Sequence, residues 1–209
     1  MTLQEVKENF IIDVATELFF ERPVSSVTIK DIAEKAGVGE MTIYRYFGKK
    51  QNIVLAVALK LQKDIYRYFD MSNGNNGFEK LSIFYNSFLK IFVESTKHYG
   101  FIKEFDSYML DNSDDNNLYG YESSLDSFKE KYLLAYEEGL KDGSVKKVDN
   151  IEMLYYSSTH ALLELCKKLS YGGLLPQDKK IEKRQEIETL INIFLQYLKN
   201  KNILGGATT

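Results

Sequence analysis

Apolar residues recur every three or four positions along most of this chain, which is the spacing of an amphipathic α-helix. In the first such stretch, Val6, Phe10, Val14 and Leu18 keep a constant step of one helical turn. Pro23 follows shortly afterwards, and its ring cannot continue a helix. No segment alternates apolar and polar residues as a half-buried strand does. The pattern predicts an all-α protein of about nine helices.

Two short helices joined by a glycine turn are predicted between residues 28 and 50, where the sequence reads TIKDIAEKAGVGEMTIYRYFGKK. Thr28 can cap the first helix, because its hydroxyl group can accept a hydrogen bond from a backbone N–H of the first turn. Gly37 allows the positive φ that a sharp turn needs. Val38 would fill the gap between the helices, and Ile43 would hold the second helix down. This arrangement places a second helix in the major groove of DNA.

The later helices are delimited by glycine, asparagine and aspartate. Between Lys49 and Phe69 there is neither glycine nor proline, so we expect one continuous helix there. The segment 72–77, with two glycines and three asparagines, is the clearest break in the chain. Three further boundaries are predicted, namely a helix end at Asp142-Gly143, a helix start at Asp149-Asn150 and a helix end at Gly172-Gly173.

Composition excludes several classes of protein. The single Cys166 rules out an internal disulfide and fits a reducing compartment. No apolar run approaches the roughly 20 residues needed to cross a bilayer, and Glu5 and Glu8 interrupt what would be a signal peptide. The net charge of −3 argues against a generally basic, non-specific nucleic-acid binder. We therefore expect a cytoplasmic protein, in which any DNA surface depends on where the charges lie.

The second short helix would expose an unusual set of side chains. They are Glu40, Met41, Thr42, Tyr44, Arg45 and Tyr46. Two exposed tyrosines on one helical turn are unusual for a helix face that contacts only water. The alternative is a helical hairpin inside a larger bundle, with Arg45 and Lys50 as ordinary solvated charges. That alternative explains the glycine turn but not the whole register of inward and outward positions.

The same stretch resembles the helix-turn-helix of TetR-family transcriptional regulators. In that family Ile-Ala, Ala-Gly-Val, Thr-Ile-Tyr, Tyr-Phe and a following lysine occur at the spacings found here between residues 32 and 50. The resemblance covers about residues 10 to 55, and its combined pattern is highly specific. Two positions depart from the family. Gly39 stands where a serine-like cap is usual, and Met41 stands where a small residue or proline is usual.

The resemblance implies which side chains meet DNA. The implied contacts are Thr28, Lys30 and Lys50 with phosphates, Thr42 and Arg45 with base edges, and Tyr44 and Tyr46 with the backbone and a flanking base. Met41 departs from the family, and two alternatives stay open for it: contact with a thymine methyl group, or a backbone held slightly further from the DNA. It also implies a division into a DNA-binding domain, residues 1–48, and an effector-binding and dimerisation domain, residues 49–209.

One recognition helix reads only a few base pairs, so helix-turn-helix proteins act as two-fold dimers on paired half-sites. We expect a homodimer formed through the two C-terminal helices, bound to a palindromic operator in double-stranded DNA. The alternative is that these helices only close the core of the monomer. The family resemblance further implies a repressor that a small-molecule effector releases from DNA. The helix between Lys49 and Phe69 would be the lever.

The chain has 15 tyrosines and 13 phenylalanines, which form either an aromatic core or an aromatic-lined cavity. The resemblance implies a pocket for an apolar or aromatic effector in this region. The candidate lining residues are Phe88, Phe105, Tyr108, Tyr132, Tyr136, Tyr155 and His160. We expect no catalytic residue, no cofactor and no metal site. The alternatives are a small-molecule-binding helical protein with vestigial DNA binding and, more remotely, a helical enzyme.

Overall fold

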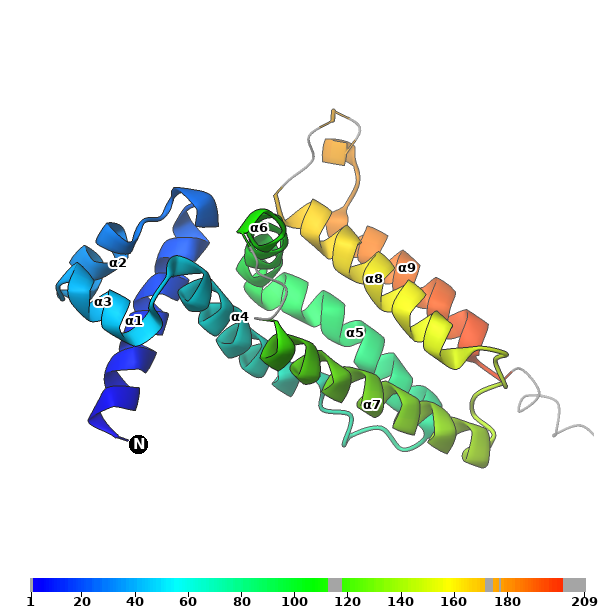
Figure 1. The fold of residues 1–209 in the computed structure, drawn as a ribbon. Helices are drawn as coiled ribbons and strands as arrows, with labels where there is room; N and C mark the ends of the chain where they lie inside the picture. The colour runs from blue at the N-terminus through cyan, green and yellow to red at the C-terminus, as the bar shows by residue number, and fades with distance from the viewer. Residues whose placement is uncertain (1, 113–117, 172–174, 177, 201–209) are drawn as a thin grey trace, which may run out of the picture. The chain divides into compact units, whose positions relative to one another are not determined.

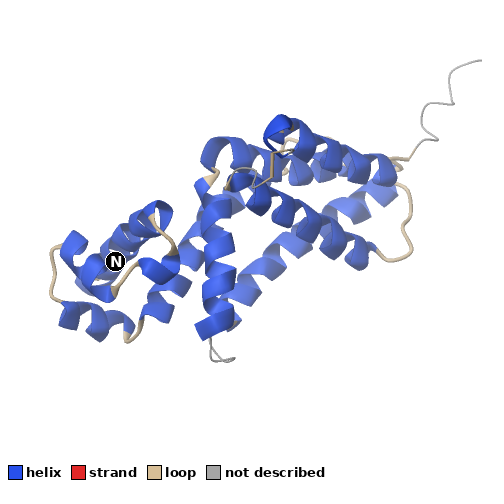
Figure 2. Cartoon of the chain, turned by 90° about the horizontal axis from the view of Figure 1, so that it is seen from above, coloured by secondary structure: helices blue, strands red, loops and turns tan. Residues whose placement is uncertain are grey.

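The computed structural model describes residues 2–112, 118–171, 175–176 and 178–200. Within these ranges Figure 2 shows helices and loops without a strand. The α-helices are α1 (Leu3–Glu21), α2 (Ile29–Ala36), α3 (Glu40–Phe47), α4 (Lys50–Tyr66), α5 (Gly77–Ser95), α6 (Lys97–Asn112), α7 (Tyr119–Asp142), α8 (Ile151–Ser170) and α9 (Lys183–Leu198) (Figure 1). The predicted all-α fold is thereby confirmed.

Most helix boundaries lie where local chemistry predicted them. Arg22 leaves α1 in an extended conformation just before Pro23, and Gly143 follows α7 at a φ of 80°. Asn150 caps α8 by accepting a hydrogen bond from the N–H of Met153 at 2.9 Å. The predicted end at Gly172-Gly173 lies outside the described residues. The predicted end of the helix near Phe69 is wrong, because α4 ends at Tyr66 and a 3₁₀ turn, Arg67–Phe69, replaces its expected last turn.

The chain packs as two compact units. The first unit combines Met1–Asp64 with Lys97–Ser124, and the second combines Ile65–Thr96 with Leu125–Thr209. Packing thus places α6 with the N-terminal helices. Helix α4 begins in the first unit and ends in the second. The functional division at residue 48 concerns DNA and effector binding, so it stays a prediction.

The core of the first unit is aliphatic beneath the two short helices. Ile32 of α2, Ile43 of α3 and Ile53 of α4 are fully buried together with Ala15 of α1. Burying each of these isoleucines stabilises the fold by about 1.5–3 kcal/mol relative to leaving it in water. These side chains hold the helix-turn-helix on a support made by α1, α4 and α6.

The second unit has an aromatic core between α5, α7 and α8. The ring of Phe84 meets that of Tyr132 nearly edge-on, with centroids 5.2 Å apart. The Tyr85 hydroxyl group lies 2.9 Å from both the Tyr132 hydroxyl group and Ser158 Oγ. Buried hydroxyl groups that lack partners are costly, so this network lets tyrosines occupy an otherwise apolar core.

None of the helices in the described part of the chain combines the length and apolar character that a bilayer span requires.

Candidate nucleic-acid interface

The first helix of the motif begins at a reciprocal cap. Thr28 Oγ1 accepts a hydrogen bond from the Asp31 N–H at 3.1 Å, and Asp31 Oδ2 accepts one from the Thr28 N–H at 2.7 Å. The bonds from Thr28 hold the pKa of Asp31 below its usual value, and the nearby charge of Arg22 acts in the same direction. Two otherwise unpaired backbone donors are satisfied in this way. The start of α2 is therefore determined locally, as the sequence predicted.

The turn between α2 and α3 requires a glycine at one position only. Gly37 has a φ of 65° and a ψ of 32°, the left-handed conformation in which a side chain is strained. The Val38 N–H donates to the Ala33 carbonyl oxygen at 3.0 Å, and the Val38 side chain packs half-buried against the core. Gly39 is extended and provides no side-chain cap for α3. Its departure from the family pattern thus weakens the cap, as expected.

Helix α3 has one buried side and one exposed side. Ile43 is completely buried, whereas Met41 is 79% exposed and Tyr44 is 46% exposed. Arg45 is also exposed, and Thr42 and Tyr46 are half-buried at the edges of this face. The structure therefore brings the five predicted α3 contacts to one accessible side of the helix. Their contacts with DNA remain a prediction.

Arg45 is held beside an aromatic ring. Its guanidinium carbon lies 5.0 Å from the centroid of the Tyr46 ring, and Nη2 lies 3.4 Å from the Tyr46 hydroxyl oxygen. Stacking on an aromatic face restricts a long side chain that would otherwise lose conformational freedom when it binds. The tyrosine thus orients the guanidinium group while leaving it exposed.

Most other cations around the motif are neutralised by carboxylates. Lys35 Nζ lies 3.1 Å from a carboxylate oxygen of Glu17, Lys60 Nζ lies 2.8 Å from one of Asp13, and an Arg22 nitrogen lies 3.5 Å from Asp31. Arg45, by contrast, forms no ion pair with any described residue. Residues 1–50 carry seven basic and eight acidic side chains. Despite that balance, these pairs leave the Arg45 guanidinium group as a cation on α3 that no carboxylate of the described residues neutralises.

The two predicted phosphate-contacting lysines differ in their surroundings. Lys30, on the first turn of α2, is exposed, and its Nζ lies 3.9 Å from a carboxylate oxygen of Glu34. Lys50 is half-buried, and its Nζ donates to the carbonyl oxygens of Val24 at 2.5 Å and Ser25 at 3.3 Å. Sequence reasoning missed these carbonyl partners, because they lie about 25 residues away.

The candidate effector residues divide between the two units. Phe105 and Tyr108 lie on α6 in the first unit, and the other five lie in the second. Tyr132 and Tyr136 are buried and already hydrogen-bonded; the Tyr136 hydroxyl oxygen accepts from the Val148 N–H at 2.7 Å. Phe88, Phe105 and Tyr155 are buried as well, whereas Tyr108 is half-buried and His160 is exposed. Their role in binding an effector remains a prediction.

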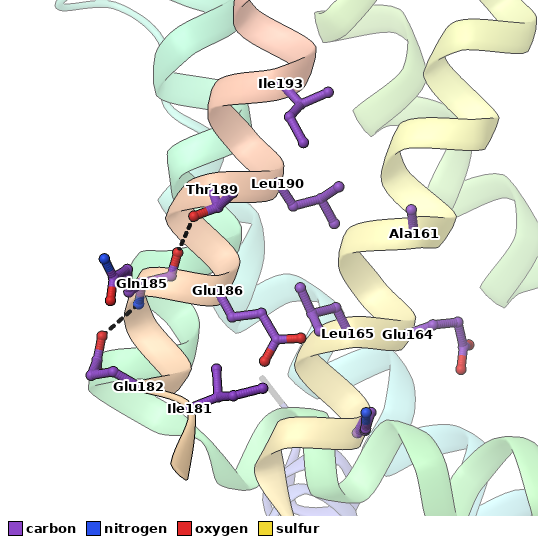
Figure 3. A pocket seen from close by; sticks show the side chains of 11 residues that line it. Ala161, Glu164, Leu165, Ile181, Glu182, Gln185, Glu186, Thr189, Leu190 and Ile193 are labelled. Carbon is purple, nitrogen blue, oxygen red and sulfur yellow. Dashed lines mark hydrogen bonds between the residues drawn. The ribbon is translucent and has the colours of Figure 1, made fainter. Parts of the chain in front are cut away.

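A groove runs between α8 and α9 in the second unit. It has a volume of about 870 Å³, and Figure 3 shows Leu165 of α8 and Leu190 of α9 pointing into the space between the helices. Ile193 and Ile181 extend the apolar lining and are 57% and 49% exposed. Sequence reasoning named the two helices but not this groove, because adjacent helix faces are brought together only by packing.

Residues 11–57 match the family model described as bacterial regulatory proteins, tetR family. The matched segment contains α2, the Gly37 turn and α3, which are the elements that form the interface described above. Residues 11–57 are thus a DNA-binding domain of the TetR-family type. The protein is accordingly a DNA-binding transcriptional regulator.

Comparisons with other proteins extend the similarity beyond the matched segment. The regulator AlkX of Mycobacterium tuberculosis is 30% identical over 86 residues, which span 39% of this chain and only 37% of AlkX. The icaADBC biofilm operon negative regulator IcaR of Staphylococcus aureus is 23% identical over 89% of this chain and 97% of its own. A solved structure of the fatty acid degradation regulator FadR from Bacillus halodurans has a TM-score of 0.67 and 20% identity, covering 90% of this chain and 94% of FadR. This last likeness supports the fold.

Serine substitutions at the two glycines of the turn should have opposite effects on stability. Gly37→Ser should lower the free energy of unfolding by about 1–2 kcal/mol, because of the positive φ. Gly39→Ser should raise it by a few tenths of a kcal/mol, because a serine there can cap α3 and no atom lies within 4 Å of the added Cβ. Urea unfolding of both variants measures the difference. Equal effects would contradict the assigned backbone conformations.

Proposed function

We propose that this protein is a repressor that binds a palindromic operator as a homodimer and dissociates when a small molecule binds. The observation that carries the proposal is the exposed side of α3, where Tyr44 and an arginine without an ion-pair partner among the described residues lie together. Repression, as opposed to activation, is supported by IcaR, which is named a negative transcriptional regulator. The protein would act in the cytoplasm, where its DNA lies.

In this proposal α3 enters the major groove. Arg45 would donate to the two acceptors of a guanine edge, and Met41 would contact a thymine methyl group. Thr42 would reach a neighbouring base, while Tyr44 and Tyr46 would contact the sugar–phosphate backbone and a flanking base. Thr28 caps α2 and Lys30 lies on its first turn, where backbone N–H groups and the helix dipole favour a phosphate. Residues 1–48 would thus bind DNA, and residues 49–209 would bind the effector and form the dimer.

Substitution of Arg45 tests the assignment of the DNA surface. Arg45→Ala should weaken binding to a duplex from the region upstream of the gene by about 1–3 kcal/mol, because a bidentate base contact is lost. Arg67→Ala is the matched control, since Arg67 is exposed and its guanidinium carbon lies 5.5 Å from the Tyr68 ring centroid in the second unit. Fluorescence anisotropy measures both affinities. The assignment fails if the two variants bind DNA equally well.

The groove between α8 and α9 is the proposed dimer surface. Its half-buried leucine and exposed isoleucine side chains would be covered by the same surface of a second copy, as a two-fold axis requires. The groove also carries both signs of charge, with Glu164 and Lys168 on α8 and Glu186 on α9. Charges of both signs allow a two-fold related copy to form complementary pairs. Two helices from each protomer would make a four-helix bundle.

A charge placed in the groove should separate the protomers. Ile193→Glu should convert the dimer to a monomer, because an unpaired carboxylate would be buried in an apolar contact. Val93→Glu is the control, since Val93 on α5 is 59% exposed and Ile193 is 57% exposed. Sedimentation equilibrium gives the mass of each variant. A dimeric Ile193→Glu variant, or a monomeric Val93→Glu variant, would place the dimer surface elsewhere.

The proposed effector is an apolar or aromatic small molecule bound among the rings of the second unit. Phe88, Tyr132, Tyr136 and Tyr155 contribute to this core, and the described FadR neighbour is named for fatty acid degradation. Since the tyrosine hydroxyl groups already have partners, the effector would have to shift these side chains as it enters. Helix α4, which begins in one unit and ends in the other, would carry the change to the DNA-binding helices.

Decanoate is a suitable first probe of this pocket. It should raise the unfolding temperature of the protein and lower its affinity for DNA, because a ligand stabilises the form to which it binds best. Tyr132→Phe should raise the concentration needed by about tenfold, since one hydrogen-bonding group is lost. Leu134→Ala, which alters a 65% exposed side chain on the same helix, should leave the response unchanged. Loss of the response in both variants would contradict the proposed location.

A further inference from the structure

A chain of hydroxyl groups crosses the core of the second unit. The Tyr85 hydroxyl group of α5 lies 2.9 Å from the Tyr132 hydroxyl group of α7 and 2.9 Å from Ser158 Oγ of α8. Ser158 Oγ in turn donates to the backbone carbonyl oxygen of Tyr155 at 3.1 Å. Tyr85, Tyr132 and Ser158 are fully buried, so bulk water does not compete for their protons.

The direction of this chain follows from a count of its protons. A hydroxyl group has one proton to donate and two lone pairs that can accept. The Tyr155 carbonyl oxygen can only accept, so it takes the proton of Ser158. The Tyr85 proton must then serve the contact with Ser158, and the Tyr132 proton must serve the contact with Tyr85. All three protons are therefore used inside the chain, and none is left to donate to a ligand.

The Tyr132 oxygen is the open end of the chain, and what it has left to offer is an acceptor. Within the part of the chain that the structure describes, its hydrogen-bonding contact is with Tyr85 alone. Because its own proton is used there, both lone pairs of the oxygen are available. The Tyr132 ring centroid lies 5.2 Å from those of Phe84 and Tyr155. A ligand among these rings would thus find a buried acceptor in aromatic surroundings.

We propose that the effector is an uncharged apolar alcohol or phenol, whose hydroxyl group donates its proton to the Tyr132 oxygen. This inference rests on the proposed effector site in the second unit. An ether, a ketone or an ionised carboxylate has no proton to donate, so it would place an acceptor against an acceptor. A ligand with a hydroxyl group adds one hydrogen bond and leaves the three existing ones in place.

The charges of the second unit also favour an uncharged effector. Burial raises the pKa of Tyr85 and of Tyr132, so both hydroxyl groups keep their protons at neutral pH. Among the described residues of this unit, Lys167 of α8 is the only buried one with a charge, and its Nζ lies 2.6 Å from a carboxylate oxygen of the exposed Glu164. A carboxylate that entered the aromatic core would lose its hydration, and the hydroxyl chain has no proton to give it.

Probes that share a decyl chain and differ at the head group test this chemistry. 1-Decanol can donate and accept, decyl methyl ether can only accept, and decanoate is ionised at neutral pH. The unfolding temperature of the whole chain is measured against the concentration of each probe. It should respond to 1-decanol at about a tenfold lower concentration than to the ether, because one hydrogen bond is gained. Decanoate should also need a higher concentration than 1-decanol, since only its small protonated fraction has a donor.

Two substitutions separate the hydroxyl chain from general effects on packing. Tyr132→Phe removes the acceptor, so 1-decanol and the ether should act at similar concentrations. Ser158→Ala leaves the Tyr85 proton free to turn to the Tyr132 oxygen, which releases the Tyr132 proton for a ligand. The ether should therefore act at a lower concentration on Ser158→Ala than on the unmodified protein. Tyr156→Phe is the matched control, because Tyr156 lies on α8 and is 40% exposed, and it should keep the preference for 1-decanol.

Several results would overturn the inference. They are equal responses of the unmodified protein to 1-decanol and the ether, a preference for 1-decanol that survives in Tyr132→Phe or is lost in Tyr156→Phe, and an unimproved ether response in Ser158→Ala. A stronger response to decanoate than to 1-decanol would also overturn it, and loss of that response in Lys131→Met would assign the effector to the half-buried Lys131 instead. No response to any of the probes would refute the apolar effector site of the proposed function itself.

Discussion

An eight-residue helix cannot hold its own shape in water, and the proposed DNA surface of this protein depends on such a helix. Isolated helices of this length are unstable, because nucleation costs more than so few hydrogen bonds return. Helix α3 has eight residues, and Ile43 is its buried side chain. Its conformation is therefore imposed from both ends, by the Gly37 turn before it and, after it, by Gly48 and the hydrogen bond from Asn52 to the carbonyl oxygen of Phe47. That dependence leaves the rest of its surface available for DNA.

Many of the charged side chains around α3 are paired with one another. Ion pairs such as Lys35 with Glu17 and Lys60 with Asp13 lie between neighbouring helices and cancel their own charge. Exposed pairs of this kind add little stability, so their main consequence is where positive charge remains. One place where it remains is Arg45 of α3, which the Tyr46 ring holds in place. A chain with a net charge of −3 can therefore still present an unpaired cation on its proposed DNA surface.

The core of the second unit contains several tyrosines, and their hydroxyl groups need hydrogen-bonding partners. Tyr85, Tyr132 and Ser158 satisfy one another, and burial raises the pKa of Tyr85 and Tyr132 because it disfavours the charged phenolate. Tyrosines offer large apolar area and a hydroxyl group that needs a partner. An effector that entered this core, as proposed, would have to replace or extend some of these hydrogen bonds.

Local physics determined much of this protein from sequence alone. A threonine cap at Thr28, a positive φ at Gly37 and the three-to-four-residue spacing of apolar side chains depend on neighbours within one or two turns, so they could be predicted. The 3₁₀ turn after Tyr66 could not, because apolar spacing barely distinguishes it from a last α-helical turn. Packing alone decided that α6 joins the N-terminal helices, that α8 and α9 enclose a groove, and that Lys50 bonds to carbonyl oxygens of the Val24–Ser26 turn. Those features depend on residues far apart in the chain, and no local pattern records which of them meet.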